Sequence, residues 1–312
     1  MKVVVTGATS FLGSTLVKKL LMGGQFVYAV IRPDSKNRKE LPEKMKNLVI
    51  IECDLKNMDQ IDEKIPERCD YFFHLGWGGS GSANRKEINL QKQNVDNSVK
   101  ALTGAMKLGC RRFLFSGSQA EYGQYNRLKA EEDICEPVSE YGKAKREFYF
   151  CASRMCKEWR ERGIADIKYI HTRIFSVYGF GDHPWSLVQT CLKTFLEGGH
   201  IDLGACTQKW NFLYIDDLAE GLMALMFCSG LLREDGIYNV AGTESQTIPL
   251  RGYVEEMYRL CGEKGSYEYG KRPPNAEGLV NLIPDTTRIR TDTGWVPKIS
   301  FDEGIRRMIE KM

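Results

Sequence analysis

The feature that most constrains the fold is an apolar strand that runs directly into a glycine turn and a helix. Residues Lys2–Thr6 are rich in valine, which is typical of a buried parallel strand. Gly7 and Gly13 bracket the turn, and leucines at helical spacing follow it, namely Leu12, Leu16, Leu20 and Leu21. Such a turn presents backbone N–H groups and the positive end of a helix dipole to a phosphate. The pattern predicts a pyrophosphate site, or else a plain strand-to-helix turn that needs glycine only for its backbone geometry.

Strand and helix patterns then alternate through the first two thirds of the chain. Further strands are predicted at 25–31, 48–52, 71–75, 112–115 and 168–172. Helices are predicted between them, most clearly at about 87–107 and 141–162. This alternation indicates an α/β fold with a doubly wound parallel sheet of the Rossmann type, in which ligands bind beyond the carboxyl ends of the strands.

The last third of the chain is less regular. Helices are predicted near 184–197, 217–227 and 301–311, with a stretch rich in glycine and proline around 262–284. We therefore expect residues 1–180 to form a dinucleotide-binding domain that also carries the catalytic residues. Residues 181–312 are expected to form mainly a smaller substrate-binding lobe, with some elements returning to the sheet.

Composition narrows the classes of protein. Lys and Arg number 44 against 41 Asp and Glu, and this balance gives no case for binding nucleic acid or membranes. No apolar run approaches the roughly 20 residues that span a bilayer, and no signal or transit peptide is evident, so a cytoplasmic location is expected. The 10 cysteines include no C-x-x-C pair and no metal-like spacing with the 4 histidines. They predict reduced, mostly buried thiols and no metal site.

The strongest chemical signal is Tyr141-Gly-Lys-Ala-Lys145. A tyrosine and a lysine four residues apart share one face of a helix. There the ammonium of Lys145 would lower the pKa of the Tyr141 phenol from about 10 and make it a proton donor or acceptor near neutral pH. Such a pair is common on solvated helix surfaces, but behind a strand, a glycine turn and a helix it points to hydride-transfer chemistry.

Motifs along nearly the whole chain resemble those of the extended short-chain dehydrogenase/reductases that act on nucleotide sugars, a family that includes epimerases, 4,6-dehydratases and 4-ketoreductases. They occur in the family's order and at its spacing. They are Thr6-Gly7-x5-Gly13, Asp54-Leu55, His74-Leu75-Gly76, Ser116-Gly117-Ser118 with Tyr122-Gly123, Tyr141 with Lys145, the segment Arg173–Gly179, Tyr214-Ile-Asp-Asp217 and Gly294-Trp295-x-Pro297.

The resemblance implies a role for each matched position. Tyr141 would be the acid/base, Lys145 would bind the nicotinamide ribose, and Ser118 would hydrogen-bond the sugar oxygen that becomes or ceases to be a carbonyl. Asp54 and Leu55 would frame the adenine. Ser118 could instead be an ordinary hydroxyl at a strand end, and Asp54 a helix cap. The predicted cofactor-binding residues are Gly7, Ser10, Phe11, Leu12, Gly13, Arg32, Asp54, Leu55, Leu75, Gly76 and Lys145.

Two departures from the family pattern affect phosphate binding. The middle glycine of the turn is Ser10, a small residue that would hydrogen-bond a phosphate instead. The arginine that epimerases place before their Asp-Phe or Asp-Tyr pair is Trp210. Contacts to the sugar diphosphate would then fall to Lys209 or to Arg272, which precedes two prolines where the family has Gly-Asp.

The reaction is narrowed by two further positions. Dehydratases carry Asp-Glu directly after the catalytic hydroxyl, whereas Gln119 and Ala120 stand here and supply no acid or base. Arg32 ends the second predicted strand, where an NAD enzyme usually has an acid against the ribose 2′-OH. Arg32 would pair with a 2′-phosphate, helped by Ser35, Lys36 or Arg38, which favours NADPH over NAD. Asp34, two residues on, is the counter-evidence.

The leading hypothesis is an NADPH-dependent reductase of the C4 ketone of a nucleotide-linked 4-keto-6-deoxy sugar. The alternatives are an NAD-dependent nucleotide-sugar 4-epimerase and, less favoured, a non-catalytic nucleotide-binding protein on the same fold. The predicted substrate-binding residues are Trp77, Ser118, Gln119, Lys209 and Arg272, with Pro184 and Trp185 as further candidates to line the pocket. The resemblance also implies a homodimer through the helices predicted at 87–107 and 141–162.

Overall fold

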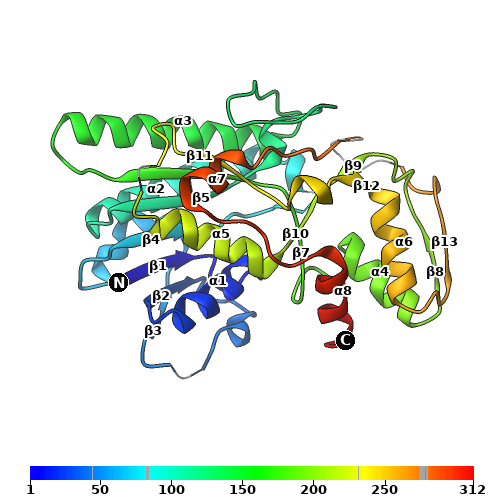
Figure 1. Ribbon diagram of the computed structural model, residues 1–312. Coiled ribbons are helices and arrows are strands. Elements are labelled where there is room, and N and C mark those ends of the chain that lie inside the picture. Colours follow the sequence, from blue (N-terminus) through cyan, green and yellow to red (C-terminus); the bar gives the residue numbers. More distant parts are fainter. Residues whose placement is uncertain (44, 82–83, 231, 274–277, 279) are drawn as a thin grey trace.

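A single parallel sheet organises the molecule (Figure 1). The computed structural model describes residues 1–43, 45–81, 84–230, 232–273, 278 and 280–312. Its main sheet has 7 strands in the order β11-β6-β5-β4-β1-β2-β3, all parallel to their neighbours. The strands are β1 (Lys2–Thr6), β2 (Phe26–Ile31), β3 (Leu48–Glu52), β4 (Tyr71–His74), β5 (Arg112–Ser118), β6 (Lys168–Ile174) and β11 (Ile237–Val240).

Alternating side chains of each central strand supply two separate cores. In β1, Val3 and Val5 face one cluster, while Val4 faces the other. Because successive side chains of a strand point to opposite faces, an unbroken apolar run has to be covered on both. The Val4 face is covered by α2 (Ile88–Lys107), α3 (Glu140–Glu161) and the 3-10 segment η2 (Leu55–Glu63). The Val3 face is covered by α1 (Phe11–Met22), α5 (Ile215–Phe227) and α7 (Thr287–Thr293).

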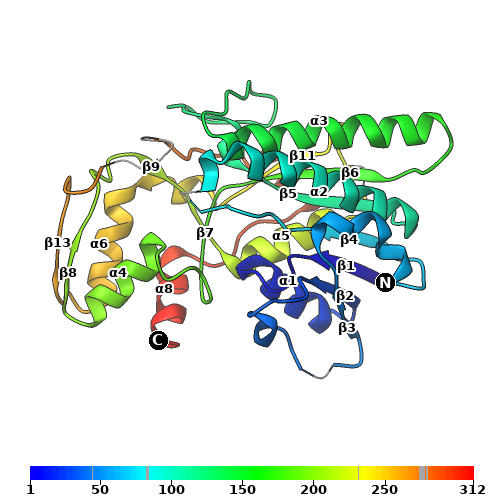
Figure 2. The same ribbon diagram turned by 180° about the vertical axis from the view of Figure 1, so that it is seen from behind.

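The lobe beyond one end of the sheet contains α4 (Leu187–Leu196), α6 (Leu250–Leu260), α8 (Phe301–Ile309) and short strand pairs (Figures 1 and 2). β8 (His200–Asp202) pairs with β13 (Ser266–Glu268), and β9 (Lys209–Trp210) pairs with β12 (Ile248–Pro249). β7 (Ser176–Tyr178) and β10 (Phe212–Tyr214) form a further parallel pair. These pairs join segments far apart in sequence, so the lobe depends on long-range contacts.

The predicted doubly wound α/β fold is confirmed, with differences in the last third. Helices α6 and α7 were not predicted, nor was β11, which adds to the main sheet beside β6. All 10 cysteines are unpaired, and most are buried, as predicted. Among the described residues, no helix is both long and apolar enough to cross a membrane.

Candidate active site

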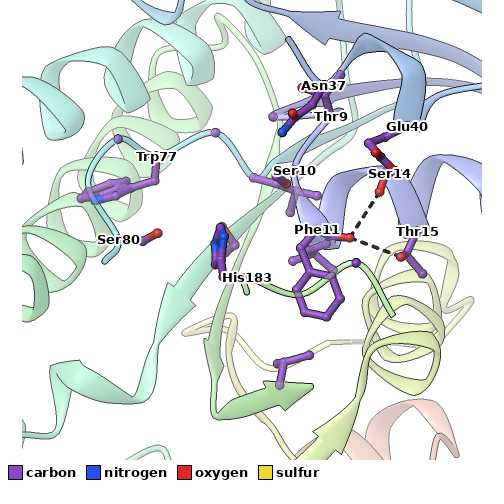
Figure 3. Close-up of a pocket in the computed structure, with 18 of the residues that line it drawn as sticks. Thr9, Ser10, Phe11, Ser14, Thr15, Asn37, Glu40, Trp77, Ser80 and His183 are labelled. Atoms are coloured by element: carbon purple, nitrogen blue, oxygen red, sulfur yellow. Dashed lines mark hydrogen bonds between the residues drawn. The ribbon is translucent and has the colours of Figure 1, made fainter. Parts of the chain in front are cut away.

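A cavity of about 1700 Å³ opens at the carboxyl ends of the central strands. In Figure 3, Ser10 and Phe11 lie on one side of it, Trp77 and Ser80 lie on the other, and His183 lies between them. Most of the predicted site residues line this cavity: Gly7, Ser10, Phe11, Leu12, Arg32, Asp54, Leu55, Leu75, Gly76, Trp77, Ser118, Tyr141 and Lys145. Gly13, Gln119, Lys209 and Arg272 are not among its lining residues.

The turn after β1 is built for close approach of its backbone. Gly7 has φ of +65°, and a Cβ there would lie 2.8 Å from the backbone nitrogen of Gly76. A Cβ on Gly13 would lie 2.1 Å from the carbonyl oxygen of Gly7, so α1 packs directly on the turn. A cradle that a methyl group would fill, facing a helix N-terminus, fits the pyrophosphate of a dinucleotide.

Ser10 explains how the turn works without its middle glycine. It is the N-cap of α1, with φ of −75° and ψ of 168°, a conformation that any residue adopts. Its hydroxyl accepts a hydrogen bond from the backbone nitrogen of Gly13 at 3.0 Å. The serine therefore stabilises the helix start through its oxygen, and its O–H still has a hydrogen to donate to a phosphate.

The loop after β2 presents several polar side chains to the cavity. Arg32 is exposed and lines the cavity, and no hydrogen bond or ion pair holds its guanidinium within the described residues. Ser35 lies 3.0 Å from the hydroxyl of Thr9, and Arg38 forms an ion pair with Glu52 at 3.0 Å. Of the predicted helpers of Arg32, Ser35 and Lys36 line the cavity, whereas Arg38 does not. Asp34 also lines it, so the side chains that would favour each cofactor are both present there.

The neighbouring strand ends complete the predicted adenine site. Asp54 caps η2 by accepting from the backbone nitrogen of Lys56 at 3.0 Å, so the cap that the sequence allowed is present. The side chain still lines the cavity. Leu55 packs against the Cα position of Gly76, where a Cβ would meet its methyl carbons at 3.0 Å.

A buried histidine holds the loop after β4. The hydroxyl of Ser98 donates to the carbonyl of Asn94 at 2.8 Å, which leaves it to accept from Nε2 of His74 at 3.0 Å. Nδ1 of His74 then accepts from the hydroxyl of Thr6 at 2.7 Å. Burial, and secondarily the charge of Lys145, lowers the pKa of His74 to about 3. The imidazole is therefore neutral. Its two hydrogen bonds connect β4 to β1 through Thr6 and to α2 through Ser98.

Two amides on α2 fix the segment that carries Trp77. The indole of Trp77 donates to Gln91 at 2.9 Å. Asn94 accepts from the nitrogen of Gly78 at 2.9 Å and donates to its carbonyl at 2.8 Å. Both amides are buried. Sequence reasoning missed them, although a glutamine and an asparagine three residues apart on one helix face were a usable signal.

Ser118 ends β5 at the edge of the cavity. It is 8% exposed, and its hydroxyl accepts from the nitrogen of Ala120 at 3.2 Å. The backbone nitrogen of Ser118 donates to the carboxylate of Glu121 at 2.9 Å. Glu121 is fully buried against His171 and Arg173. Burial alone would raise the pKa of Glu121, but His171, Arg173 and the Ser118 N–H together hold it below its usual value. This carboxylate, also missed from the sequence, therefore anchors the loop and faces away from the cavity.

Tyr141 and Lys145 lie on the first turns of α3, whose cap Ser139 accepts from the nitrogen of Gly142 at 3.2 Å. Both line the cavity and both are buried. The ammonium of Lys145 donates to the carbonyl of Ser116 at 2.6 Å and lies 5.5 Å from the centre of the Tyr141 ring. Burial lowers the pKa of Lys145 well below its usual value. The negative charge of Glu121 raises this pKa in part, and the positive charge of Arg85 lowers it further.

The lobe residues that were predicted to bind substrate lie apart from this cluster. Lys209 and Arg272 are exposed, and Gln119 is half-buried with its Oε1 unpartnered among the described residues. Trp210 packs against the cluster around Tyr122. Pro184 lines the cavity, whereas Trp185 is 73% exposed and stacks on His183.

One candidate metal cluster lies elsewhere. His200, Asp202 and Glu268 place one ligand atom each within 4.8 Å of one another, on β8 and β13. All three are exposed, and none lines the cavity, so they form no part of the candidate active site.

Comparison with known proteins identifies the family. The family model described as the NAD dependent epimerase/dehydratase family matches residues 3–241. The chain belongs to this family. Membership agrees with the geometry, since the glycine cradle, Tyr141 and Lys145 all lie within the matched residues. The protein is therefore an NAD(P)-dependent enzyme of the extended short-chain dehydrogenase/reductase type, as the sequence predicted.

Individual proteins are similar to this chain over nearly its whole length. GDP-mannose 3,5-epimerase 1 of Oryza sativa subsp. indica is 24% identical, over 98% of this chain and 80% of that protein. CDP-abequose synthase of Salmonella muenchen is 22% identical, over 99% of this chain and 97% of that protein. The structure of UDP-glucose 4-epimerase from Thermotoga maritima with UDP-glucose superposes with a TM-score of 0.83 at 25% identity, covering 99% and 98% of the two chains.

Proposed function

We propose that this protein is an NADPH-dependent reductase of the C4 ketone of a nucleotide-linked 4-keto-6-deoxy sugar. The observation that carries the reductase assignment is Arg32, which directly follows β2 and lines the cavity, and whose guanidinium has no partner within the described residues. A guanidinium there favours a cofactor with a 2′-phosphate. NADPH in turn suits a net reduction that releases oxidised cofactor.

A nucleotide-linked sugar is supported by the relatives. The two epimerases are named for GDP-mannose and UDP-glucose, and the synthase is named for CDP-abequose. All three names therefore refer to a nucleotide-linked sugar. The positions after Ser118 support a reductase over a dehydratase. Ala120 has no ionisable group, and the nearby Glu121 is fully buried against His171 and Arg173. No carboxylate in this loop is left to expel water from the sugar.

The chain's own groups divide the chemistry between them. Bound NADPH supplies a hydride for the ketone carbon. Tyr141 gives its phenolic proton to the alkoxide that forms at C4, and Ser118 hydrogen-bonds the same oxygen. Lys145 keeps a positive charge near the phenol. Burial of all three side chains excludes competing water, because each is no more than 8% exposed.

In the test, the enzyme is mixed with NADPH and with 4-keto-6-deoxyglucose linked to CDP, dTDP, UDP or GDP. Turnover is measured as the loss of absorbance of the reduced nicotinamide. Replacing Tyr141 with Phe removes the proton but keeps the ring, so turnover should fall about a hundredfold or more while cofactor binding persists. Tyr149→Phe, on the same helix but outside the cavity, is the matched control. Near-wild-type turnover by Tyr141→Phe would remove Tyr141 from the mechanism.

A nucleotide-sugar 4-epimerase remains the second candidate. Asp34 lines the cavity two residues after Arg32, where it would suit an NAD ribose. Two of the similar proteins are named as epimerases. NAD that stays bound through purification, together with interconversion of C4 epimers and no net use of NADPH, would favour this candidate.

We also propose that the enzyme acts as a cytoplasmic homodimer through α2 and α3. The two helices lie side by side along one face of the molecule in both ribbon views (Figures 1 and 2). Phe148 is fully buried and Tyr149 and Met155 are partly buried in the parent core, so Phe150, 56% exposed, is the main apolar side chain of α3 left for a partner. Light scattering at micromolar concentration should give twice the mass of one chain, and the mass of a single chain would contradict the dimer.

A further inference from the structure

Arg85 brings a second cation to the ring of Tyr141. It belongs to the 3-10 turn η3 (Asn84–Lys86), outside every motif that the sequence analysis used. Its guanidinium carbon lies 4.6 Å from the centre of the Tyr141 ring. Its Nε donates to the carbonyl of Ser80 at 2.8 Å, which fixes the side chain from the loop after β4. Arg85 is half-buried and lines the cavity.

The surroundings of the ring make its charge state matter. Lys145 lies 5.5 Å from the ring centre, on the same helix, and Trp77 meets the ring edge-on at 6.2 Å with an interplanar angle of 87°. Arg85 and Lys145 therefore both place a positive charge over this ring. The negative charge of Glu121 raises the pKa of Lys145 and so favours its charged form. A guanidinium over an aromatic face is attractive, and the attraction grows when the ring carries a full negative charge.

We propose that Arg85 is a positioning residue for proton transfer, which holds the ring of Tyr141 and stabilises its phenolate. The inference rests on the proposed role of Tyr141 as the acid. When the substrate carbonyl is reduced by hydride from NADPH, the O–H bond of Tyr141 breaks and its proton goes to the new alkoxide. The electron pair stays on the phenol oxygen, and Arg85 and Lys145 both face the ring that then carries the charge.

The two cations have different tasks. Lys145 is buried and donates to the carbonyl of Ser116 at 2.6 Å, and the family resemblance gives it the nicotinamide ribose. Arg85 enters from a different element, η3, and its Nε is tied to the carbonyl of Ser80, in the loop that carries Trp77. The acidity of Tyr141 therefore depends on how this loop is held against α3.

The test measures the ionisation of Tyr141 directly, by the near-ultraviolet absorbance of phenolate as a function of pH. In each background the titration of the matching Tyr141→Phe variant is subtracted. Burial raises the pKa of other tyrosines, such as Tyr122 and Tyr169, so they ionise later and interfere little. Arg85→Gln should move the midpoint of Tyr141 upward by about one pH unit. Arg85→Lys, which keeps the charge, should move it by less than half as much.

The control is Lys86→Gln, which removes the same charge from the next residue, an exposed side chain outside the cavity. It should leave the midpoint unchanged. Thermal unfolding and NADPH binding confirm that each variant is folded.

An unchanged midpoint in folded Arg85→Gln overturns the inference and leaves the proposed function intact, whereas full turnover by Tyr141→Phe contradicts the proposed function itself. If Arg85→Gln does not fold, Arg85→Met removes the same charge, and a midpoint in folded Arg85→Met equal to that of the wild type overturns the inference.

Discussion

The cofactor end of the cavity and the lobe beyond it are built in different ways. At the cofactor end, the side chains of Thr6 on β1 and His74 on β4 hydrogen-bond to each other, and Ser10 caps α1 by accepting from the backbone nitrogen of Gly13. In the lobe, Gln208 and Trp210 each bury a polar atom that has no partner among the described residues. A buried polar atom without a partner is costly, so it is the kind of group that a ligand can satisfy. Gln25 and Asp62 also bury an oxygen that has no hydrogen-bond partner among the described residues, so the two regions differ mainly in how their backbone is fixed. We propose a preformed cofactor site beside a lobe that substrate contacts would complete.

The largest expected effect tests how rigid the cofactor end is. Gly7→Ala places a Cβ 2.8 Å from Gly76 at a left-handed backbone, whereas Gly24, also left-handed at φ of +77°, has no heavy atom within 4 Å of that position. Gly24→Ala should cost about 1 kcal/mol from the backbone alone. Gly7→Ala should cost about 1–3 kcal/mol more and abolish NADPH binding.

Denaturant unfolding of the two glycine variants gives this difference, and fluorescence of NADPH reports its binding. Because both substitutions carry the same backbone cost, the excess in Gly7→Ala measures the close approach of the turn to Gly76. Equal losses in the two variants would mean that the turn yields easily and that the cofactor end is no more rigid than a surface loop.

A smaller effect tests the lobe. Arg272 is exposed and outside the cavity, and its backbone nitrogen is held by the carbonyl of Leu203 at 3.1 Å. If it reaches a substrate phosphate across the lobe, an exposed contact of about 1 kcal/mol is lost in Arg272→Ala. Binding of nucleoside diphosphates should then weaken about fivefold. Calorimetry with CDP, dTDP, UDP and GDP measures this, with Arg290→Ala on α7, exposed and outside the cavity, as control.

Unchanged affinity in Arg272→Ala would leave the lobe without this phosphate contact. The same loss in Arg290→Ala would assign the effect to net charge.

The sequence predicted the strand, glycine turn and helix at the N-terminus, and the helix that carries Tyr141 and Lys145, because their geometry is local. A strand, two glycines and a helix within the first 22 residues determine the turn, and Tyr141 and Lys145 meet through the helix repeat alone. The helix cap at Asp54 and the burial of Ser118 were also within reach of local rules.

The lobe could not be predicted in the same way. Lys209 is placed by pairing of β9 with β12 and by a contact of its nitrogen with Asn281 at 2.7 Å, across a long stretch of chain. Similarly, Glu121 is positioned by His171 and Arg173 on β6. No short-range pattern encodes such meetings, since they depend on which strands become neighbours in the sheet.

The central claim is that the cavity is set for NADPH through Arg32, and the affinities of the wild type and Arg32→Ala for NADPH and NADH test it most directly. A charge-assisted contact to the 2′-phosphate is worth about 1.5–3 kcal/mol, so Arg32→Ala should bind NADPH about tenfold to a hundredfold more weakly. Its affinity for NADH should hardly change, and Arg38→Ala, whose side chain pairs with Glu52, should leave both affinities intact. Equal weakening toward both cofactors would reduce Arg32 to a stacking contact on adenine. Unchanged binding of both cofactors would contradict the claim and remove the main support for a reductase over an epimerase.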